Sequence, residues 1–255
     1  MKKNNIYRAD PALNHNLSIT LIGCGGTGAL VLQGLAIICN NLYAAGRQSD
    51  INVRAYDGDN VSIANVGRQP FHPLEIGKNK AVCLVNRLNL CNGLNFEAIP
   101  QFVTEQSVFN RGRLNLIIAC VDSRAARRKI KHAILEMTIP GVYYLDCGND
   151  KKSGQVLIGC TNRNSDYGLP MPWDICPDLV SNAPEDNTPS CSLAEALNSQ
   201  DLMVNRFAAM IALELVWQLL RYNTLHNQGA FFDCRKLKMT PVGIRPQNTQ
   251  KSTKE

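Results

Sequence analysis

The chain has 255 residues, of which 45% are hydrophobic and 19% are charged, a composition typical of a folded globular protein. Its net charge of +6 is too small and too scattered to indicate a dedicated nucleic-acid-binding protein. No apolar run reaches the roughly 18 residues that a membrane span needs, and no signal peptide follows the charged N-terminus. We therefore expect a cytoplasmic protein without membrane association.

Short apolar segments alternate with longer segments of helical spacing along the first 160 residues. Strands are predicted at 17–22, 51–57, 95–99, 114–120, 142–147 and 155–160. Helices are predicted at 29–42, 78–91 and 124–137. This alternation predicts a doubly wound, mainly parallel α/β sheet of the Rossmann-like class.

The later part of the chain departs from this pattern. Residues 161–192 contain five of the twelve prolines and predict a long crossover loop, which in a compact domain is usually functional or mobile. A helix predicted at 193–222 is apolar almost all round, as in a core or a subunit interface. A last strand is predicted at 229–237. We expect a single domain over 1–245 and a polar tail over 246–255.

The ten cysteines form no disulfide framework that the sequence can specify, because no export signal is visible and their spacing is irregular. No two of them form a Cys-x-x-Cys pair, so we expect no structural zinc. Most lie in apolar runs and are interpreted as small buried hydrophobes.

A glycine cluster follows the first predicted strand and opens the first helix. Its glycines are Gly23, Gly25, Gly26 and Gly28. Glycines allow a tight turn and a close approach to a ligand, and the amides at a helix N-terminus favour phosphate. The cluster predicts a nucleotide site without specifying the nucleotide, and a tight turn without ligand is the alternative.

Acidic and cationic residues follow the next strands. Asp57 and Asp59 stand where an acid can accept hydrogen bonds from ribose hydroxyls, and a dehydrogenase would look the same up to this point. Beyond them come Asn65, Arg68, Gln69 and Lys80. Cations in this place are needed by a triphosphate rather than by a redox cofactor, because its charges must be neutralised. Asp122, after another strand, is a candidate Mg²⁺ ligand, with helix capping as the alternative.

Taken together, these motifs resemble the ThiF/MoeB/HesA superfamily of ATP-dependent enzymes that activate ubiquitin-like and sulfur-carrier proteins. The resemblance covers about residues 15–160 and rests on the glycine loop, Asp57-x-Asp59, Asn65-x-x-Arg68-Gln69, Gly77-x-x-Lys80 and Asp122-Ser123-x-x-x-Arg127. The segment 189–196 is most similar to the ThiF-like proteins of plasmid-associated PRTRC systems. Those systems also encode a ubiquitin-like protein and a conjugating-enzyme homologue.

The resemblance implies roles for individual residues. Gly26 would contact the phosphates of ATP and Asp57 its ribose, while Asp122 would hold Mg²⁺. Asn65, Arg68 and Lys80 would face the triphosphate, and Arg127 is the family-like arginine of the following helix. The non-functional alternative for Lys80 is an exposed lysine on a helix. For the basic run at 124–131 the alternative is a helix face that is exposed to solvent.

Cys191 is the candidate nucleophile. Ser192 and Glu195 have the spacing of a capping box, which would place Cys191 just before a helix N-terminus, where the dipole stabilises a thiolate. In the family, a cysteine at the matching point accepts the activated carboxyl group as a thioester or a persulfide-linked adduct. Cys176 is the second candidate, and a cysteine packed under a loop is the alternative for Cys191.

We therefore expect an enzyme that adenylates the C-terminal glycine of a ubiquitin-like protein with Mg²⁺ and ATP, then transfers it through a cysteine to a conjugating enzyme. The resemblance also implies a homodimer. Three alternatives stay open: a sulfur-carrier adenylyltransferase, an NAD(P)-binding oxidoreductase, and a non-catalytic adaptor on the same fold.

Overall fold

The computed structural model describes residues 5–9, 16–47, 51–107, 114–137, 141–161, 167–184 and 201–246. Its centre is an eight-stranded sheet with strand order β11-β10-β7-β6-β5-β2-β3-β4. The parallel part comprises β4 (Glu97–Ile99), β3 (Ile51–Tyr56), β2 (Leu17–Ile22), β5 (Leu114–Ala119) and β6 (Tyr143–Asn149). The remaining strands, β7 (Ser153–Cys160), β10 (Asn227–Asp233) and β11 (Lys238–Gly243), pair antiparallel.

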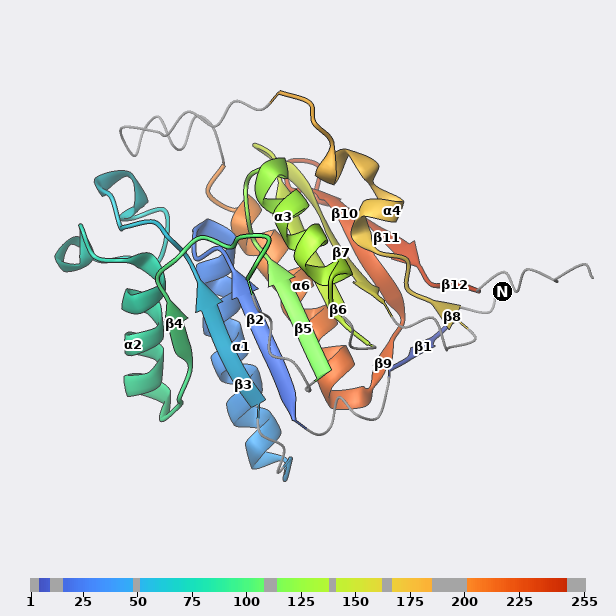
Figure 1. Cartoon of the computed structure of the whole chain (residues 1–255), viewed down its shortest axis with the longest axis horizontal. Coiled ribbons are helices and arrows are strands. Elements are labelled where there is room, and N and C mark those ends of the chain that lie inside the picture. Colours follow the sequence, from blue (N-terminus) through green and yellow to red (C-terminus); the bar gives the residue numbers. More distant parts are fainter. Residues whose placement is uncertain are drawn as a thin grey trace, which may run out of the picture.

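Helices cover both faces of the sheet (Figure 1). One face carries α1 (Gly26–Ala44), α2 (Lys80–Asn92) and α6 (Val204–Tyr222), and the other carries α3 (Arg124–Leu135) and α4 (Pro172–Ile175). The doubly wound, mainly parallel α/β fold predicted from the sequence is therefore confirmed.

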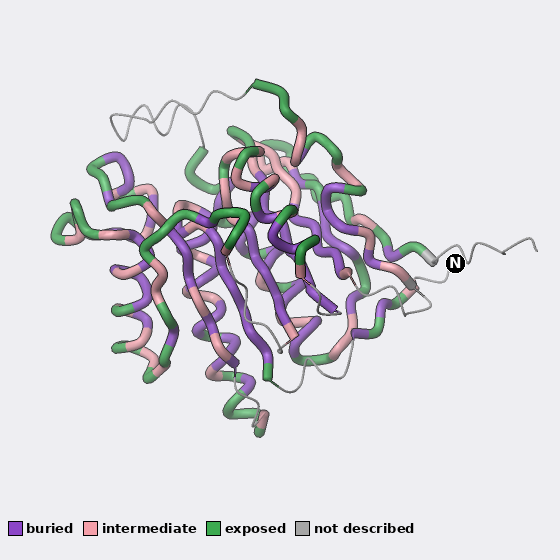
Figure 2. The backbone as a smooth tube through the Cα atoms, in the orientation of Figure 1, coloured by how far each residue is buried: buried purple, intermediate pink, exposed green. Residues whose placement is uncertain are grey.

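Two hydrophobic clusters fill the spaces between these layers, and the buried residues concentrate along the strands (Figure 2). The larger cluster joins the sheet to α1, α2 and α6, and the smaller one joins it to α3 and α4. By length and composition α1 could cross a membrane, but 56% of its most apolar window is buried inside the molecule. That burial is typical of a core helix in a globular protein.

Short elements complete the described chain. They are β1 (Tyr7–Arg8), paired with β9 (Thr224–Leu225), β8 (Tyr167–Gly168), paired with β12 (Arg245–Pro246), and three 3₁₀ turns, η2 (Ile63–Asn65), η3 (Pro73–Glu75) and η4 (Pro177–Val180).

The predicted crossover loop is less irregular than expected in its described part, 167–184, because it contains α4 and η4. Pro172 occupies the first turn of α4, where a missing N–H costs nothing. Asp174 accepts a hydrogen bond from the Met171 amide at 3.2 Å, and the Trp173 ring packs against Tyr144 at 5.2 Å between centroids.

Two other predicted elements have different limits. The strand predicted at 229–237 is confirmed only as far as Asp233, where β10 ends, because a turn occupies 234–237 and leads into β11, which the sequence analysis did not predict. Asp233 stabilises that turn by accepting a hydrogen bond from the Lys236 amide at 3.0 Å, and Leu237 has a positive φ of 49°. The long helix predicted at 193–222 begins at Val204 among the described residues. Residues 193–200 are not among those that the structure describes.

Candidate functional site

The carboxyl ends of three central strands meet at one edge of the sheet. Ile22 at the end of β2 is in register with Tyr56 on β3 and Ala119 on β5. Backbone hydrogen bonds continue this pairing beyond the strands, from the Gly23 amide to the Tyr56 carbonyl and from the Cys120 amide to the Ile22 carbonyl, both at 2.8 Å. In a doubly wound sheet this edge is where ligands bind.

The glycine loop makes a tight turn above β2. Gly23 has a φ of +91°, which side chains rarely adopt, and a Cβ at Gly28 would lie 1.8 Å from the Gly23 carbonyl oxygen. At Gly25 a Cβ would meet nothing within 4 Å, so this side of the loop is open. Helix α1 starts here with no side-chain cap and no acidic residue in its first turn. Its first amide N–H groups are therefore oriented to bind an anion.

Asp57 joins the glycine loop to the end of β3. Its buried carboxylate accepts hydrogen bonds from the Cys24 amide at 2.6 Å and from the Asp59 amide at 2.8 Å. Burial raises the pKa of Asp57, while the two hydrogen bonds and the nearby Lys80 charge oppose that rise. The carboxylate thus fixes the position of the loop relative to β3.

Lys80 is a buried cation of the same cluster, so the interpretation as an exposed helix lysine is wrong. Its Nζ lies 3.0 Å from Asp59 Oδ2, and its amide donates to the Asp59 carbonyl at 3.0 Å. The neighbouring Asn79 caps α2 by accepting from the Val82 amide, and its side-chain nitrogen donates to the carbonyls of Asp57 and Asp59. The start of α2 is therefore tied to the acidic turn.

The residues from 60 to 79 form an excursion that is closed at its base by hydrogen bonds between Val61 and the segment 77–78. Asn65 is buried within it, and its Oδ1 accepts from the Ser62 amide at 2.9 Å, which closes η2. Gln69 is also buried, and its backbone N–H donates a hydrogen bond to the Asn65 carbonyl. Arg68 lies in the same excursion and is half-buried, and burial lowers its pKa.

Asp122 and Arg127 belong to a second group, which lines a cavity of about 300 Å³ beyond β5 and β6. Ser123 is the N-cap of α3, because its hydroxyl accepts from the Ala126 amide at 3.2 Å. The capping alternative for Asp122 is therefore wrong, and its carboxylate is exposed at the strand edge. It lines the cavity together with Arg127 and the Cys176 residue of the crossover.

Arg127 is buried in an ion pair. Its Nε lies 2.9 Å from Asp146 Oδ2, and Tyr144 donates its hydroxyl to the same oxygen at 2.8 Å. Burial disfavours the guanidinium charge, but the Asp146 carboxylate outweighs this effect, so the pKa of Arg127 is raised. Arg127 therefore borders the cavity as a fixed charge, which limits its freedom to follow a ligand.

The candidate nucleophiles differ in what the structure says of them. Cys191, with Ser192 and Glu195, lies outside the described residues. Cys176 follows α4, and burial raises the pKa of its thiol, with further contributions from the carboxylates of Asp178 and Asp146. A raised pKa lowers the fraction of reactive thiolate at neutral pH.

Sequence reasoning missed a buried polar network at the glycine loop. Asn205 Oδ1 accepts from the Thr27 hydroxyl at 2.9 Å and from Asn149 Nδ2 at 3.0 Å, and Asn149 Nδ2 also contacts Thr27 Oγ1 at 3.1 Å. A Cβ at Gly26 would lie 2.5 Å from Asn205 Nδ2, so α6 approaches the loop closely. The available signal was an asparagine at the start of an otherwise apolar helix.

Comparison with known proteins agrees with this architecture. Over 254 residues the chain is 22% identical to a ubiquitin-like modifier-activating enzyme 5 of Oryza sativa subsp. japonica, covering 92% of this chain and 56% of that protein. It is 28% identical over 136 residues to the Dictyostelium discoideum enzyme of the same name, covering 48% of this chain and 33% of that one. The matched part of the chain thus spans little more than half the length of the Oryza sativa protein and a third of the Dictyostelium discoideum protein.

Among solved structures, E. coli MccB with ATP is similar, with a TM-score of 0.62 and 14% identity. The match covers 93% of this chain and 68% of that one, and at this identity it shows the fold alone. A sequence model of the ThiF family matches residues 12–254. This protein therefore belongs to the ThiF family, as its motifs predicted.

Proposed function

We propose that this protein uses ATP to adenylate the C-terminal carboxylate of a protein substrate. The observation that carries the proposal is the direct linkage of the glycine loop, Asp57, Asp59 and Lys80 at one sheet edge. A buried lysine beside an uncapped helix N-terminus suits a polyphosphate, whose charge it can neutralise. Membership of the ThiF family and sequence similarity to ubiquitin-like modifier-activating enzymes support the same reaction class.

The residues at this edge fit ATP. The open side of the loop at Gly25 leaves room for phosphate, and the amides at the start of α1 are suitable donors. Asp57 and Asp59 would accept hydrogen bonds from the ribose, and Lys80 with Arg68 would neutralise the phosphates. Asn65 and Gln69 would shape the excursion that carries Arg68.

Asp122 would hold Mg²⁺, which supplies charge neutralisation on the phosphates when bound. Within the described ranges, no group of three or more His, Cys, Asp or Glu side chains could hold a metal. Asp122 would therefore contribute one carboxylate, and phosphate oxygens and water would complete the octahedral set that Mg²⁺ prefers.

The proposed substrate is a ubiquitin-like protein that ends in glycine. Its carboxylate oxygen would attack the α-phosphorus of ATP, forming an acyl–phosphate bond as the bond to pyrophosphate breaks. The thiolate of Cys191 would then attack the carbonyl carbon and release AMP, giving a thioester for transfer to a conjugating enzyme. A sulfur-carrier protein is the alternative substrate.

ATP–pyrophosphate exchange tests the proposal directly, with a ubiquitin-like protein that ends in glycine as the substrate. Replacement of Lys80 by alanine should lower the exchange rate by about a hundredfold, because it removes the buried cation that stabilises developing phosphate charge. Lys129→Ala is the matched control, since Lys129 is exposed on α3, on the opposite face of the sheet from α2.

Unchanged exchange in Lys80→Ala would contradict the assignment of the phosphate site. A thermal-shift comparison separates the rival functions, since Mg²⁺ with ATP should stabilise the wild-type protein and NAD(H) should not. Stabilisation by NAD(H) alone would favour the oxidoreductase, and ATP binding without exchange would favour the adaptor.

A further inference from the structure

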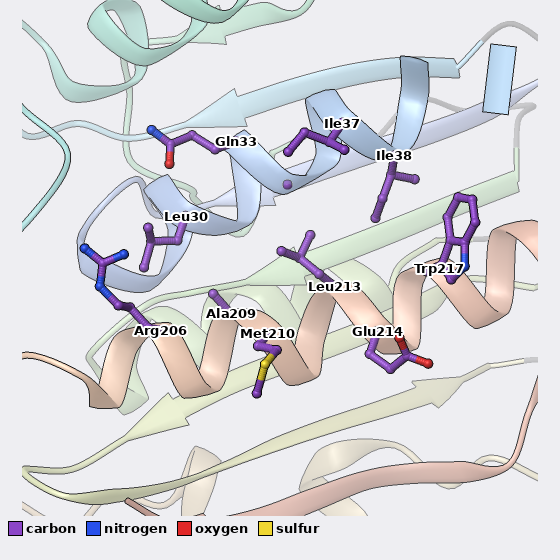
Figure 3. Close-up of a pocket in the computed structure, with 11 residues that line it drawn as sticks. Leu30, Gln33, Ile37, Ile38, Arg206, Ala209, Met210, Leu213, Glu214 and Trp217 are labelled. Atoms are coloured by element: carbon purple, nitrogen blue, oxygen red, sulfur yellow. The ribbon is translucent and has the colours of Figure 1, made fainter. Parts of the chain in front are cut away.

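Helix α2 lies at the outer end of the helical layer on its face of the sheet (Figure 1). The other two helices of that layer, α1 and α6, lie side by side, and apolar residues such as Leu30 and Leu213 line the groove between them (Figure 3). Helix α2 instead has the excursion 60–79 beside it, because Arg87 on α2 bonds to two residues of the excursion. These bonds connect α2 to the segment that carries Arg68.

The Arg87 guanidinium contacts the excursion at two separate points. Its Nη1 donates to Glu75 Oε1 at 2.7 Å, and its Nη2 donates to the Pro70 carbonyl at 2.6 Å. A guanidinium can make both bonds because it presents its N–H groups in a fixed, planar fork. The side chains of the ion pair are largely shielded from water, with exposures of 26% for Arg87 and 16% for Glu75, so salt screens this pair less than a surface pair.

Glu75 extends the connection to the backbone of the excursion. Its second carboxylate oxygen, Oε2, accepts a hydrogen bond from the His72 amide at 2.8 Å and so closes η3. The base of the excursion is closed by the bonds between Val61 and the segment 77–78. Arg87 adds a second attachment within the excursion, at Pro70 and at the turn that Glu75 closes.

Arg68 lies two residues before Pro70. It follows Gly67, whose φ of +87° reverses the chain at this point. Phe71, directly after Pro70, is buried in the larger hydrophobic cluster. The chain that leaves Arg68 is therefore held by a hydrogen bond from Arg87 and by an apolar anchor in the core.

The helix that provides Arg87 also carries the other cation of the proposed phosphate site. Lys80 is the first residue of α2, and Arg87 follows it by two helical turns, or about 10 Å at 1.5 Å per residue. A helix of this length is a rigid spacer. Helix α2 thus sets the position of Lys80 directly and that of Arg68 through Pro70.

We propose that Arg87 is a positioning residue, which holds Arg68 in place for the β- and γ-phosphates of ATP through its bonds to Pro70 and Glu75. This role rests on the proposed function, because Arg68 requires a fixed position if it neutralises a polyphosphate. AMP has no β- or γ-phosphate, so its binding should not depend on Arg87. A general structural role of Arg87 would change the binding of both nucleotides alike.

Isothermal titration with Mg²⁺ and ATP, and separately with AMP, tests the role of Arg87. Arg87→Met removes both donors and should raise the Kd for ATP about tenfold, while the Kd for AMP stays unchanged. Arg87→Lys should lie between the wild type and Arg87→Met, because a compact ammonium replaces the fork and retains one of the two bonds. Asn86→Ala, an exposed position on the same helix, is the control and should bind both nucleotides like the wild type.

A double variant tests whether Arg87 acts through Arg68. Arg68→Ala alone should raise the Kd for ATP, and adding Arg87→Met should have little further effect, because the side chain that Arg87 positions is already absent. Independent, multiplying effects of the two changes would overturn the proposed role. It would also be overturned if Arg87→Met bound ATP like the wild type, or lost affinity for ATP and AMP equally.

The same titrations separate this role from the proposed function. A wild type that binds no ATP overturns both, whereas equal ATP binding by the wild type and Arg87→Met overturns only the role of Arg87. Circular dichroism shows whether Arg87→Met is folded. If it is not, Arg87→Lys and Glu75→Gln provide the test, each with a smaller rise in the Kd for ATP and none in the Kd for AMP.

Discussion

Asn205 connects the start of α6 to the glycine loop through hydrogen bonds with two other uncharged side chains. Its amide oxygen serves Thr27 and Asn149 together, and all three side chains come from different parts of the chain. The contact that Gly26 permits brings Asn205 against the loop backbone. Asn205 is therefore a positioning residue for the loop rather than a group that must touch the substrate.

Replacement of Asn205 by alanine should raise the Kd for ATP by about tenfold, because Thr27 and Asn149 lose a shared buried acceptor. Isothermal titration with Mg²⁺ and ATP measures this, while the KM for the protein substrate should not change. Asn41→Ala on the exposed side of α1 is the control, since Asn41 bonds only within its own helix among the described contacts. Equal ATP binding by wild type and Asn205→Ala would show that the network does not position the loop.

The two candidate cysteines should separate by their chemistry. Because burial and two carboxylates raise the pKa of Cys176, a smaller share of its thiol is ionised at neutral pH than in a free cysteine. We expect Cys176→Ser to retain a reducible covalent adduct with the ubiquitin-like substrate and Cys191→Ala to lose it. Non-reducing gel electrophoresis after incubation with ATP checks both variants.

Cys91→Ser, which removes an exposed cysteine on α2, is the control for general effects of thiol removal. Alkylation gives a second measurement, since the rate at Cys176 should keep rising as the pH passes the ordinary cysteine pKa. Loss of the adduct in Cys176→Ser with retention in Cys191→Ala would reverse the assignment.

At the scale of elements, the predictable parts were those with a local signal. The strand β5, the helix α3 and the glycine turn follow from apolar runs, helical spacing and glycine chemistry. The strand predicted at 229–237 ran through the β10–β11 turn and β11 was missed, because the turn contains Cys234, Lys236 and Leu237 rather than the usual glycine or asparagine pair. The short helical elements of the crossover, α4 and η4, were not predicted, because their prolines were interpreted as loop signals. Proline also occurs at the first position of helices.

The candidate site divides in the same way. Asp57, Asp59 and Lys80 were found because they follow strands or open a helix at a shared edge, and topology then brings them together. The partners of Arg127 were missed, although a carboxylate at Asp146 within a predicted apolar strand was a signal for a buried counter-charge. Long-range polar contacts leave no periodic trace in a sequence.

At the scale of the whole molecule, the Arg127–Asp146 pair joins α3 to the centre of the sheet and is buried on both sides, with side-chain exposures of 6% and 1%. Asp146→Asn should lower the free energy of unfolding by about 3 kcal/mol, because it leaves a buried guanidinium without its counter-charge. Urea denaturation measures the change. Asp233→Asn is the control, since its ion pair with Lys236 lies at the surface, and it should change stability little.

The Arg127–Asp146 ion pair can affect both the free energy of unfolding and the shape of the cavity beside Asp122. A double variant separates these two effects. Replacement of Arg127 by methionine and Asp146 by leucine should restore most of the lost unfolding free energy, because neither charge then stays buried alone. If Arg127 also shapes the cavity beside Asp122, the restored double variant should still exchange pyrophosphate more slowly than the wild type. If the double variant exchanges pyrophosphate at the wild-type rate, the ion pair has only a structural role. If Asp146→Asn unfolds with the wild-type free energy, solvent reaches the Arg127 guanidinium.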